Sequence, residues 1–274
     1  MKNQTIRRSS VDVFAVGLLI LTLLVGCNGL YLNSRWRQAQ IIIDGKESEW
    51  SGTLMYFEKE KVAIGLQNDA DNLYLLLKAT DRNVQSQIMR AGFTIWMDAS
   101  GKKEKNFGIH YPIGIQGYGM PPARDTQPDE FRGELRRQFA EMLSEEEILG
   151  PEKNDRNRVP TMNNLGIEAS LSDTLGMMIY ELKIPMKSTE EFHYALGARP
   201  GATISLGFET GEFKRQMARQ NMRRPEGMPD QEGVRPPGER PFGRRPSERT
   251  GSGMRAEPIK FWAKATLAGA ASKN

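Results

Sequence analysis

Cysteine and histidine are both scarce in this chain, which narrows the kinds of site that it can form. One cysteine in 274 residues excludes an internal disulfide framework and any metal site built from several cysteines. The two histidines, His110 and His193, lie far apart in the sequence, and neither has a serine motif near it. Neighbouring carboxylates such as Glu145 and Glu147 fall in a charged stretch that is typical of a solvated helix face. No nucleophile or acid–base pair is indicated, so we expect a protein that is not an enzyme.

Apolar runs long enough to span a membrane are also lacking, and the nearest to one lies close to the amino terminus. Arg7 and Arg8 precede an apolar core at 13–24, which is shorter than the ~20 residues of a membrane-spanning helix. This order predicts a signal peptide over residues 1–26.

The residues that follow the apolar core are Leu-Val-Gly-Cys at 24–27, which resemble the lipobox of bacterial lipoproteins. The resemblance implies cleavage before Cys27 and acylation of that residue, with palmitate among its chains. Two or more acyl chains hold a protein firmly to a membrane. Asn28 stands where bacterial sorting reads Asp as a retention signal, so the resemblance implies the outer membrane, facing the periplasm. An uncleaved anchor helix with an incidental cysteine is the alternative.

Net charge gives no reason to expect a nucleic-acid partner. The formal charge is +4, and removal of residues 1–26 takes away three basic residues and one acid, which leaves +2. Positive charge is concentrated in 214–256, which hold eleven Lys and Arg, five acids, six Pro and six Gly. Such a segment cannot bury enough apolar surface to offset the entropy of ordering it, so we expect a disordered basic loop over about 213–257. The loop could attract anionic head groups, or it could be a solvated insertion.

The strand pattern centres on residues 71–98. Leu73–Thr80 is an unbroken apolar and β-favouring run that predicts a strand buried on both faces. Residues 84–91 have helical spacing, and Phe93–Asp98 then alternates, which places Trp96 on one face with Thr94. Further strands are expected at 41–43, 53–57, 62–66, 106–112, 166–171, 177–184, 203–210 and 259–267.

Nine or ten short strands with turn signals between them indicate an all-β fold, an antiparallel β-sandwich of the immunoglobulin-like or jelly-roll-like two-sheet kind. We expect a single domain over 41–268, preceded by a lipidated tether at 27–40 and followed by a tail at 269–274. An amphipathic helix is predicted as an insertion at about 129–150, lying over the edge or end of a sheet. Its apolar stripe consists of Phe131, Leu135, Phe139, Met142 and Leu143.

Four motifs, in order, are similar to those of the family 9 carbohydrate-binding module and its DOMON-like relatives. They are Ile43-Asp44-Gly45-Lys46 with Glu49-Trp50, Asp71-Asn72-Leu73-Tyr74-Leu75, Trp96-Met97-Asp98, and Tyr180-Glu181-Leu182-Lys183-Ile184-Pro185. The resemblance implies an antiparallel sandwich and a glycan ligand, because members of the family hold a terminal sugar between tryptophan faces.

Trp96 and Trp262 are the candidates for an exposed aromatic platform, with His110 as a polar neighbour. Each tryptophan shares its strand face with polar residues: Trp96 with Thr94 and Asp98, and Trp262 with two lysines. A pyranose packs its C–H groups on such a π surface. The alternative is that both indoles are buried, as large aromatics usually are. Trp50 is expected in the core.

Other functions remain open at the level of sequence. Relatives in the same superfamily bind haem, which would need axial Met or His, and Met89 and Met97 lie within the predicted fold. A scaffold is a further possibility, with the inserted helix or basic loop contacting a protein partner. Asp69, Asp71 and Asn72 could supply calcium ligands, but acidic turn residues more often cap the turn, so no metal is expected.

Overall fold

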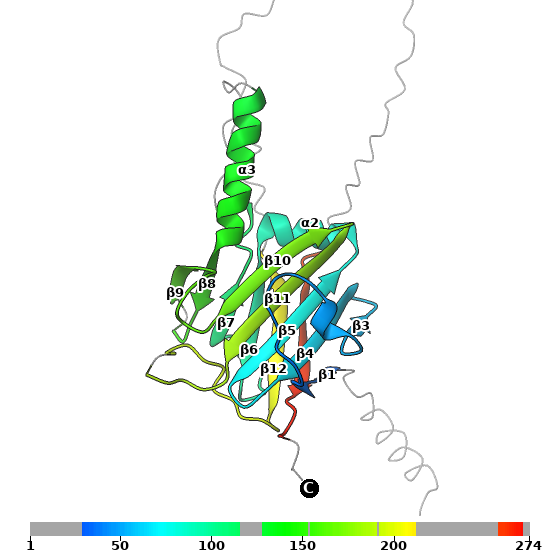
Figure 1. Cartoon of the computed structure of the whole chain (residues 1–274), viewed down its shortest axis with the longest axis vertical. Coiled ribbons are helices and arrows are strands. Elements are labelled where there is room, and N and C mark those ends of the chain that lie inside the picture. Colours follow the sequence, from blue (N-terminus) through cyan, green and yellow to red (C-terminus); the bar gives the residue numbers. More distant parts are fainter. Residues whose placement is uncertain (1–28, 116–127, 153, 191, 212–256, 271–274) are drawn as a thin grey trace, which may run out of the picture.

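The computed structural model describes residues 29–115, 128–152, 154–190, 192–211 and 257–270, which form two packed β-sheets (Figure 1). Sheet A has the order β1 (Leu30–Asn33), β13 (Lys260–Thr266), β12 (Thr203–Thr210), β6 (Phe93–Asp98), β7 (Phe107–His110), β8 (Glu145–Leu149) and β9 (Arg156–Pro160). Sheet B has the order β10 (Glu168–Thr174), β11 (Met177–Pro185), β5 (Asn72–Ala79), β4 (Val62–Asn68) and β2 (Arg35–Trp36), with β3 (Met55–Phe57) also paired to β4. The two-sheet sandwich predicted from the strand pattern is confirmed.

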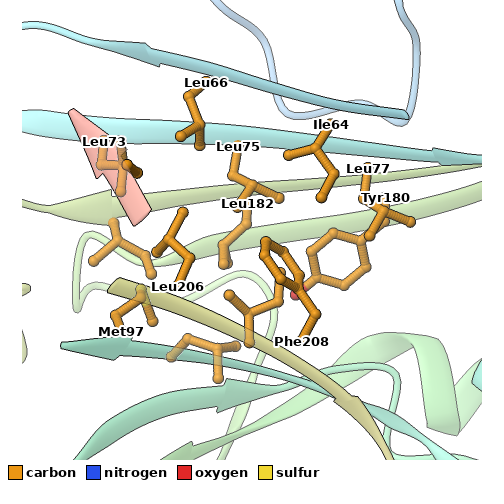
Figure 2. Packing of buried hydrophobic residues seen from close by; sticks show 14 of the residues in the cluster. Ile64, Leu66, Leu73, Leu75, Leu77, Met97, Tyr180, Leu182, Leu206 and Phe208 are labelled. Carbon is orange, nitrogen blue, oxygen red and sulfur yellow. The ribbon is translucent and has the colours of Figure 1, made fainter. Parts of the chain in front are cut away.

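The main core lies between the two sheets. Figure 2 shows side chains of sheet B, such as Leu75 and Leu182, facing Leu206 and Phe208 of sheet A. Alternate residues of each strand point into this core, because successive side chains of a strand lie on opposite faces. The strand predicted from Leu73 to Thr80 is β5, and it is buried on both faces as expected.

A second apolar cluster covers the outer face of sheet B. Tyr74 and Leu76 of β5 pack there against Trp50, which is fully buried at the end of the short 3₁₀ helix η1 (Ser48–Trp50). The expected core position of Trp50 is therefore confirmed. Ile41 joins this cluster from an irregular segment. The strand predicted at 41–43 is wrong, since these β-branched residues cover a sheet instead of forming a strand of one.

A buried carboxylate fastens this outer segment to sheet B. Glu181 Oε1 accepts a hydrogen bond from the Trp50 indole N–H at 2.7 Å. Its Oε2 accepts from the backbone N–H groups of Asp44 and Gly45, at 3.0 and 2.7 Å. Two of the sequence motifs thus meet in one hydrogen-bonded cluster, which satisfies a carboxylate that would otherwise be costly to bury. Burial raises the pKa of Glu181.

The fold begins earlier than the sequence indicates. β1 pairs in parallel with β13, and its Leu32 lies in the main core. β2 pairs in parallel with β4. The predicted tether at 27–40 and the domain start at residue 41 are therefore wrong from Leu30 onward, and the sandwich is mixed, not purely antiparallel. Partners more than two hundred residues away leave no local pattern that could have predicted β1.

The predicted helical insertion is also only partly right. The helix α3 (Pro128–Ser144) ends at Ser144, and the following five residues form β8, which pairs with β7 and β9. Glu145 and Glu147 therefore lie in a strand, and Glu147 is buried beside two arginines. Figure 1 shows α3 extending away from the sandwich instead of lying over a sheet. Pairing with β7 overrides a helical pattern that runs on into residues 145–149.

The segment with helical spacing between β5 and β6 is the helix α2 (Arg82–Ala91), as predicted. Asp81 caps its first turn by accepting hydrogen bonds from the N–H groups of Asn83 and Val84. No helix in the described ranges is long and apolar enough to cross a membrane. The predicted signal peptide, Cys27 and nearly all of the basic loop lie outside the described residues, as does the end of the tail.

Candidate functional site

The outer face of sheet A brings Trp96 and Trp262 into one row across the strands. Trp262 of β13 lies opposite Gly207 of β12, which lies opposite Trp96 of β6, which in turn lies opposite Gly108 of β7. The pairing register therefore places the two tryptophans on the outer face of sheet A, with one strand between them. Both side chains are partly exposed.

Each indole of this row lies on a glycine of the neighbouring strand. A Cβ atom added to Gly207 would stand 2.8 Å from Cε2 and Cζ2 of Trp262. A Cβ added to Gly108 would stand 2.7 Å from Cε3 of Trp96. Contacts this short leave no room for a side chain, so the backbone of both glycines supports the rings. A glycine within a strand is typical of such a close approach.

Polar groups fix the orientation of Trp96. Its indole N–H donates to Glu209 Oε1 at 2.7 Å. Lys105 Nζ donates to the same oxygen at 2.7 Å and lies 5.4 Å from the centroid of the Trp96 ring. The lysine thus adds a cation–π contact to an ion pair, and the indole is held in one position before any ligand arrives.

A cavity of about 290 Å³ adjoins Trp96 at the end of β8 and the start of β9. Its lining is mostly polar and includes Lys105, Glu152, Asn154, Asp155 and Arg156, together with Leu149 and Gly150. Asp155 and Arg156 are held in place: the Asp155 carboxylate accepts from the Glu152 N–H at 3.3 Å, and Arg156 donates to the buried Glu147 at 2.9 Å. One aromatic wall beside several hydrogen-bonding groups suits a small polar ligand better than an apolar one.

A second hollow, of about 400 Å³, lies beside residues 47–54 on the sheet B side. It adjoins Trp50, whose indole is buried and already hydrogen-bonded to Glu181. It therefore offers no free aromatic face, and the hollow at Trp96 is the stronger candidate.

His110 lies on the same outer face but does not line the cavity. Thr94 Oγ1 lies 2.8 Å from its Nδ1, and the Ile113 carbonyl oxygen lies 3.3 Å from its Nε2. Burial lowers the pKa of the His110 imidazole. Both ring nitrogens are engaged within the protein, and Met97, the methionine on the neighbouring strand, is buried in the core. The structure does not present either residue as an open haem ligand.

No group of three or more Asp, Glu, His or Cys that could hold a metal ion occurs among the described residues. Asp69 instead caps its turn, accepting from the N–H groups of Asp71 and Asn72 at 2.8 and 2.7 Å. Its second oxygen pairs with Arg37.

Most of the polar residues around Trp96 were not predicted from the sequence. Glu152 and Asp155 lie in the turn between β8 and β9. The residues of β8 were predicted as part of a helix, and β9 was not predicted. Lys105 was not predicted either, since it directly precedes the strand expected at 106–112. The alternation of 203–210 did place Gly207 and Glu209 on one face. A glycine within a strand indicates a close contact, and here that contact is with the Trp262 ring.

No family model matches the chain, and a search of curated proteins found no match. Among solved structures, the chain is similar to a carbohydrate-binding module family 9 from Caldicellulosiruptor kristjanssonii in complex with glucose. The identity is 9%, the match covers 68% of this chain and 80% of that chain, and the TM-score is 0.37. A family 9 module from the same organism in complex with cellotriose gives 10% identity, coverage of 68% and 78%, and a TM-score of 0.34. A protein from Bacteroides uniformis ATCC 8492 with a proposed carbohydrate-binding role is 12% identical. That match covers 69% of this chain and 87% of that chain, with a TM-score of 0.33. At these identities and TM-scores the similarity assigns no ligand or role to this chain.

Proposed function

We propose that this protein is a non-catalytic, glycan-binding lipoprotein of the bacterial cell envelope, with the sugar held at Trp96. The observation that carries the proposal is the partly exposed indole of Trp96, laid on Gly108 beside a polar cavity.

The chemistry of the site fits a pyranose. A sugar ring has C–H groups that pack on an aromatic face and hydroxyl groups that need hydrogen-bonding partners at its edge. Trp96 supplies the aromatic surface, which lies on Gly108 on one side and is shared with Lys105 Nζ on the other, and Asn154, Asp155 and Arg156 supply acceptors and donors around the adjoining cavity. The cavity volume of about 290 Å³ is just below the ~300–1,000 Å³ range of small-ligand sites, which suits no more than one or two sugar units.

The test is calorimetric titration of the full-length chain in a detergent without a sugar head group, using a panel of neutral oligosaccharides. We expect saturable binding by the wild type and at least a tenfold loss in Trp96→Ala, since an aromatic contact contributes about 1.5 kcal/mol or more once its buried area is included. Tyr56→Ala is the matched control, because Tyr56 is an aromatic residue of β3 that is 61% exposed and lies in the other sheet.

Absence of binding across the panel, or equal affinity in Trp96→Ala and wild type, would contradict the proposal. A visible spectrum of protein made in a haem-supplied host accompanies the titration. A Soret band in that spectrum would show that the protein binds haem, and haem would then take the place of the glycan as the proposed ligand.

The membrane anchor is a separate part of the proposal and rests on the lipobox-like residues 24–27. Cys27 would carry the acyl chains and hold the domain on the periplasmic side of the outer membrane. Palmitate labelling with fractionation tests this part: we expect label and membrane association in the wild type, and neither in Cys27→Ala. Retention of both by the variant would refute the anchor without touching the sugar site.

A further inference from the structure

We infer that the ligand is an extended neutral polysaccharide that crosses the strands of sheet A and contacts Trp96 and Trp262 together, instead of a single sugar at a chain end. This inference rests on the proposed function and specifies its substrate class.

The first argument is the spacing of the two indoles. They are separated by one intervening strand, so with ~4.8 Å between strands their Cα atoms lie about 10 Å apart, which is the length of about two pyranose units in an extended chain. Both rings lean in the same direction: Trp262 of β13 covers β12, and Trp96 of β6 covers β7. The rings therefore keep the spacing of their strands, and a chain lying across them meets an aromatic face at every second sugar.

The second argument is that no other large side chain of the row stands between the two rings. The residue on the intervening strand is Gly207, and the Trp262 ring lies over it. On the same face Ser205 is buried, and the Glu209 carboxylate accepts from the Trp96 indole N–H at the edge of that ring. A sugar chain can thus pass from the Trp262 ring to the Trp96 ring without crossing another side chain of the row.

The third argument is that the path continues at both ends. Beyond Trp96 it enters the polar cavity at Asn154 and Arg156. Beyond Trp262 it reaches β1, where Tyr31 lies opposite Lys264 and is 62% exposed. Leu32, the next residue, points into the core, so Tyr31 lies on the outer face with the tryptophans.

The charges along the path are of both signs. On one side of the tryptophan row, Lys260 lies opposite Glu209. On the other side, the next row contains Lys264 and Asp98, with Ser205 between them. Neither sign dominates, which favours a neutral chain over a polyanion. Five strand spacings separate β1 from β8, so the whole path is ~24 Å long, the length of about four or five sugar units.

The experiment is a chain-length series from monosaccharide to hexasaccharide of the neutral sugar that binds in the panel, titrated calorimetrically against the full-length chain. We expect affinity to rise at least tenfold between the disaccharide and the hexasaccharide. Trp262→Ala should abolish that rise while leaving monosaccharide affinity within about twofold. Tyr31→Ala should weaken only the hexasaccharide, and Tyr56→Ala should match the wild type at every length.

Two results would overturn the inference: equal affinity for all lengths, or a Trp262→Ala loss that is the same for monosaccharide and hexasaccharide. Either result leaves the single-sugar site at Trp96 standing. Failure of every length to bind refutes the proposed function itself, so the two failures are distinguishable.

Discussion

Glu146 is a carboxyl group buried inside the sandwich, and its protonation gives a testable dependence of stability on pH. Its carboxyl group points from β8 into the protein and is fully buried. Oε1 accepts a hydrogen bond from Asn163 at 3.0 Å, but Oε2 has no hydrogen-bond partner among the described residues, and neither has the buried hydroxyl of Tyr180. Burial raises the pKa of Glu146 from 4.5 to about 8, so the protein folds with this side chain protonated at neutral pH.

The raised pKa makes stability depend on pH in a defined direction. The folded state holds a proton that the unfolded state releases above pH 4.5, so the free energy of unfolding falls as the pH rises from 4.5 to about 8 and is level beyond. Each pKa unit corresponds to 1.36 kcal/mol, so the complete loss is about 5 kcal/mol. Glu146→Gln replaces the acid with an uncharged amide of the same shape and removes this dependence.

The assay is urea unfolding followed by far-ultraviolet circular dichroism between pH 5 and pH 9. We expect the stability of Glu146→Gln relative to wild type to rise by several kcal/mol across this window, while any cost of the extra amide donor stays constant with pH. Glu145→Gln is the control, since Glu145 lies next to it in the same strand but is partly exposed and paired with Arg158; its curve should follow the wild type. A difference between Glu146→Gln and wild type that does not change with pH would refute the reasoning.

Two further predictions concern the outer faces of the sheets. Glu181→Ala leaves the Trp50 indole N–H and two backbone N–H groups without their acceptor, so we expect a loss of about 3–5 kcal/mol in urea unfolding; a loss below 1 kcal/mol would contradict the role of this cluster. Gly207→Ala places a Cβ 2.8 Å from the Trp262 ring, so the indole must lift, and we expect a shift of tryptophan emission with weaker hexasaccharide binding. Gly269→Ala, where a Cβ meets nothing within 4 Å, should show neither change.

Strands with a regular alternation were predictable because their pattern reflects which face is buried. Residues 203–210 and 93–98 alternate clearly, and both became strands whose outward residues include those of the tryptophan row. The polar strand face of each tryptophan followed from this alternation. Their placement on one sheet and in one row did not, because the pairing register depends on which strands are neighbours.

The elements that sequence reasoning missed are those whose conformation depends on distant partners. Leu30–Asn33 pairs with a strand near the other end of the chain. A four-residue segment has no pattern of its own that would predict this pairing. Residues 145–149 extend a helical pattern, yet they pair with β7 and β9. The same error hid the buried Glu146, since a carboxyl group in a charged run is expected in solvent. The cavity residues Glu152 and Asp155 lie in a turn whose position depends on that strand.

The parallel strand β1 changes how the domain would meet a membrane. With the lipid on Cys27 that we propose, only residues 28 and 29 separate the anchor from Leu30, and a gap of that length spans at most ~10 Å. The domain would then stand on the bilayer without a flexible stalk, with the β1 edge of sheet A nearest to the lipid. The glycan path would begin at the membrane surface, so the protein would capture polysaccharide lying along the membrane and not strands that are far from it.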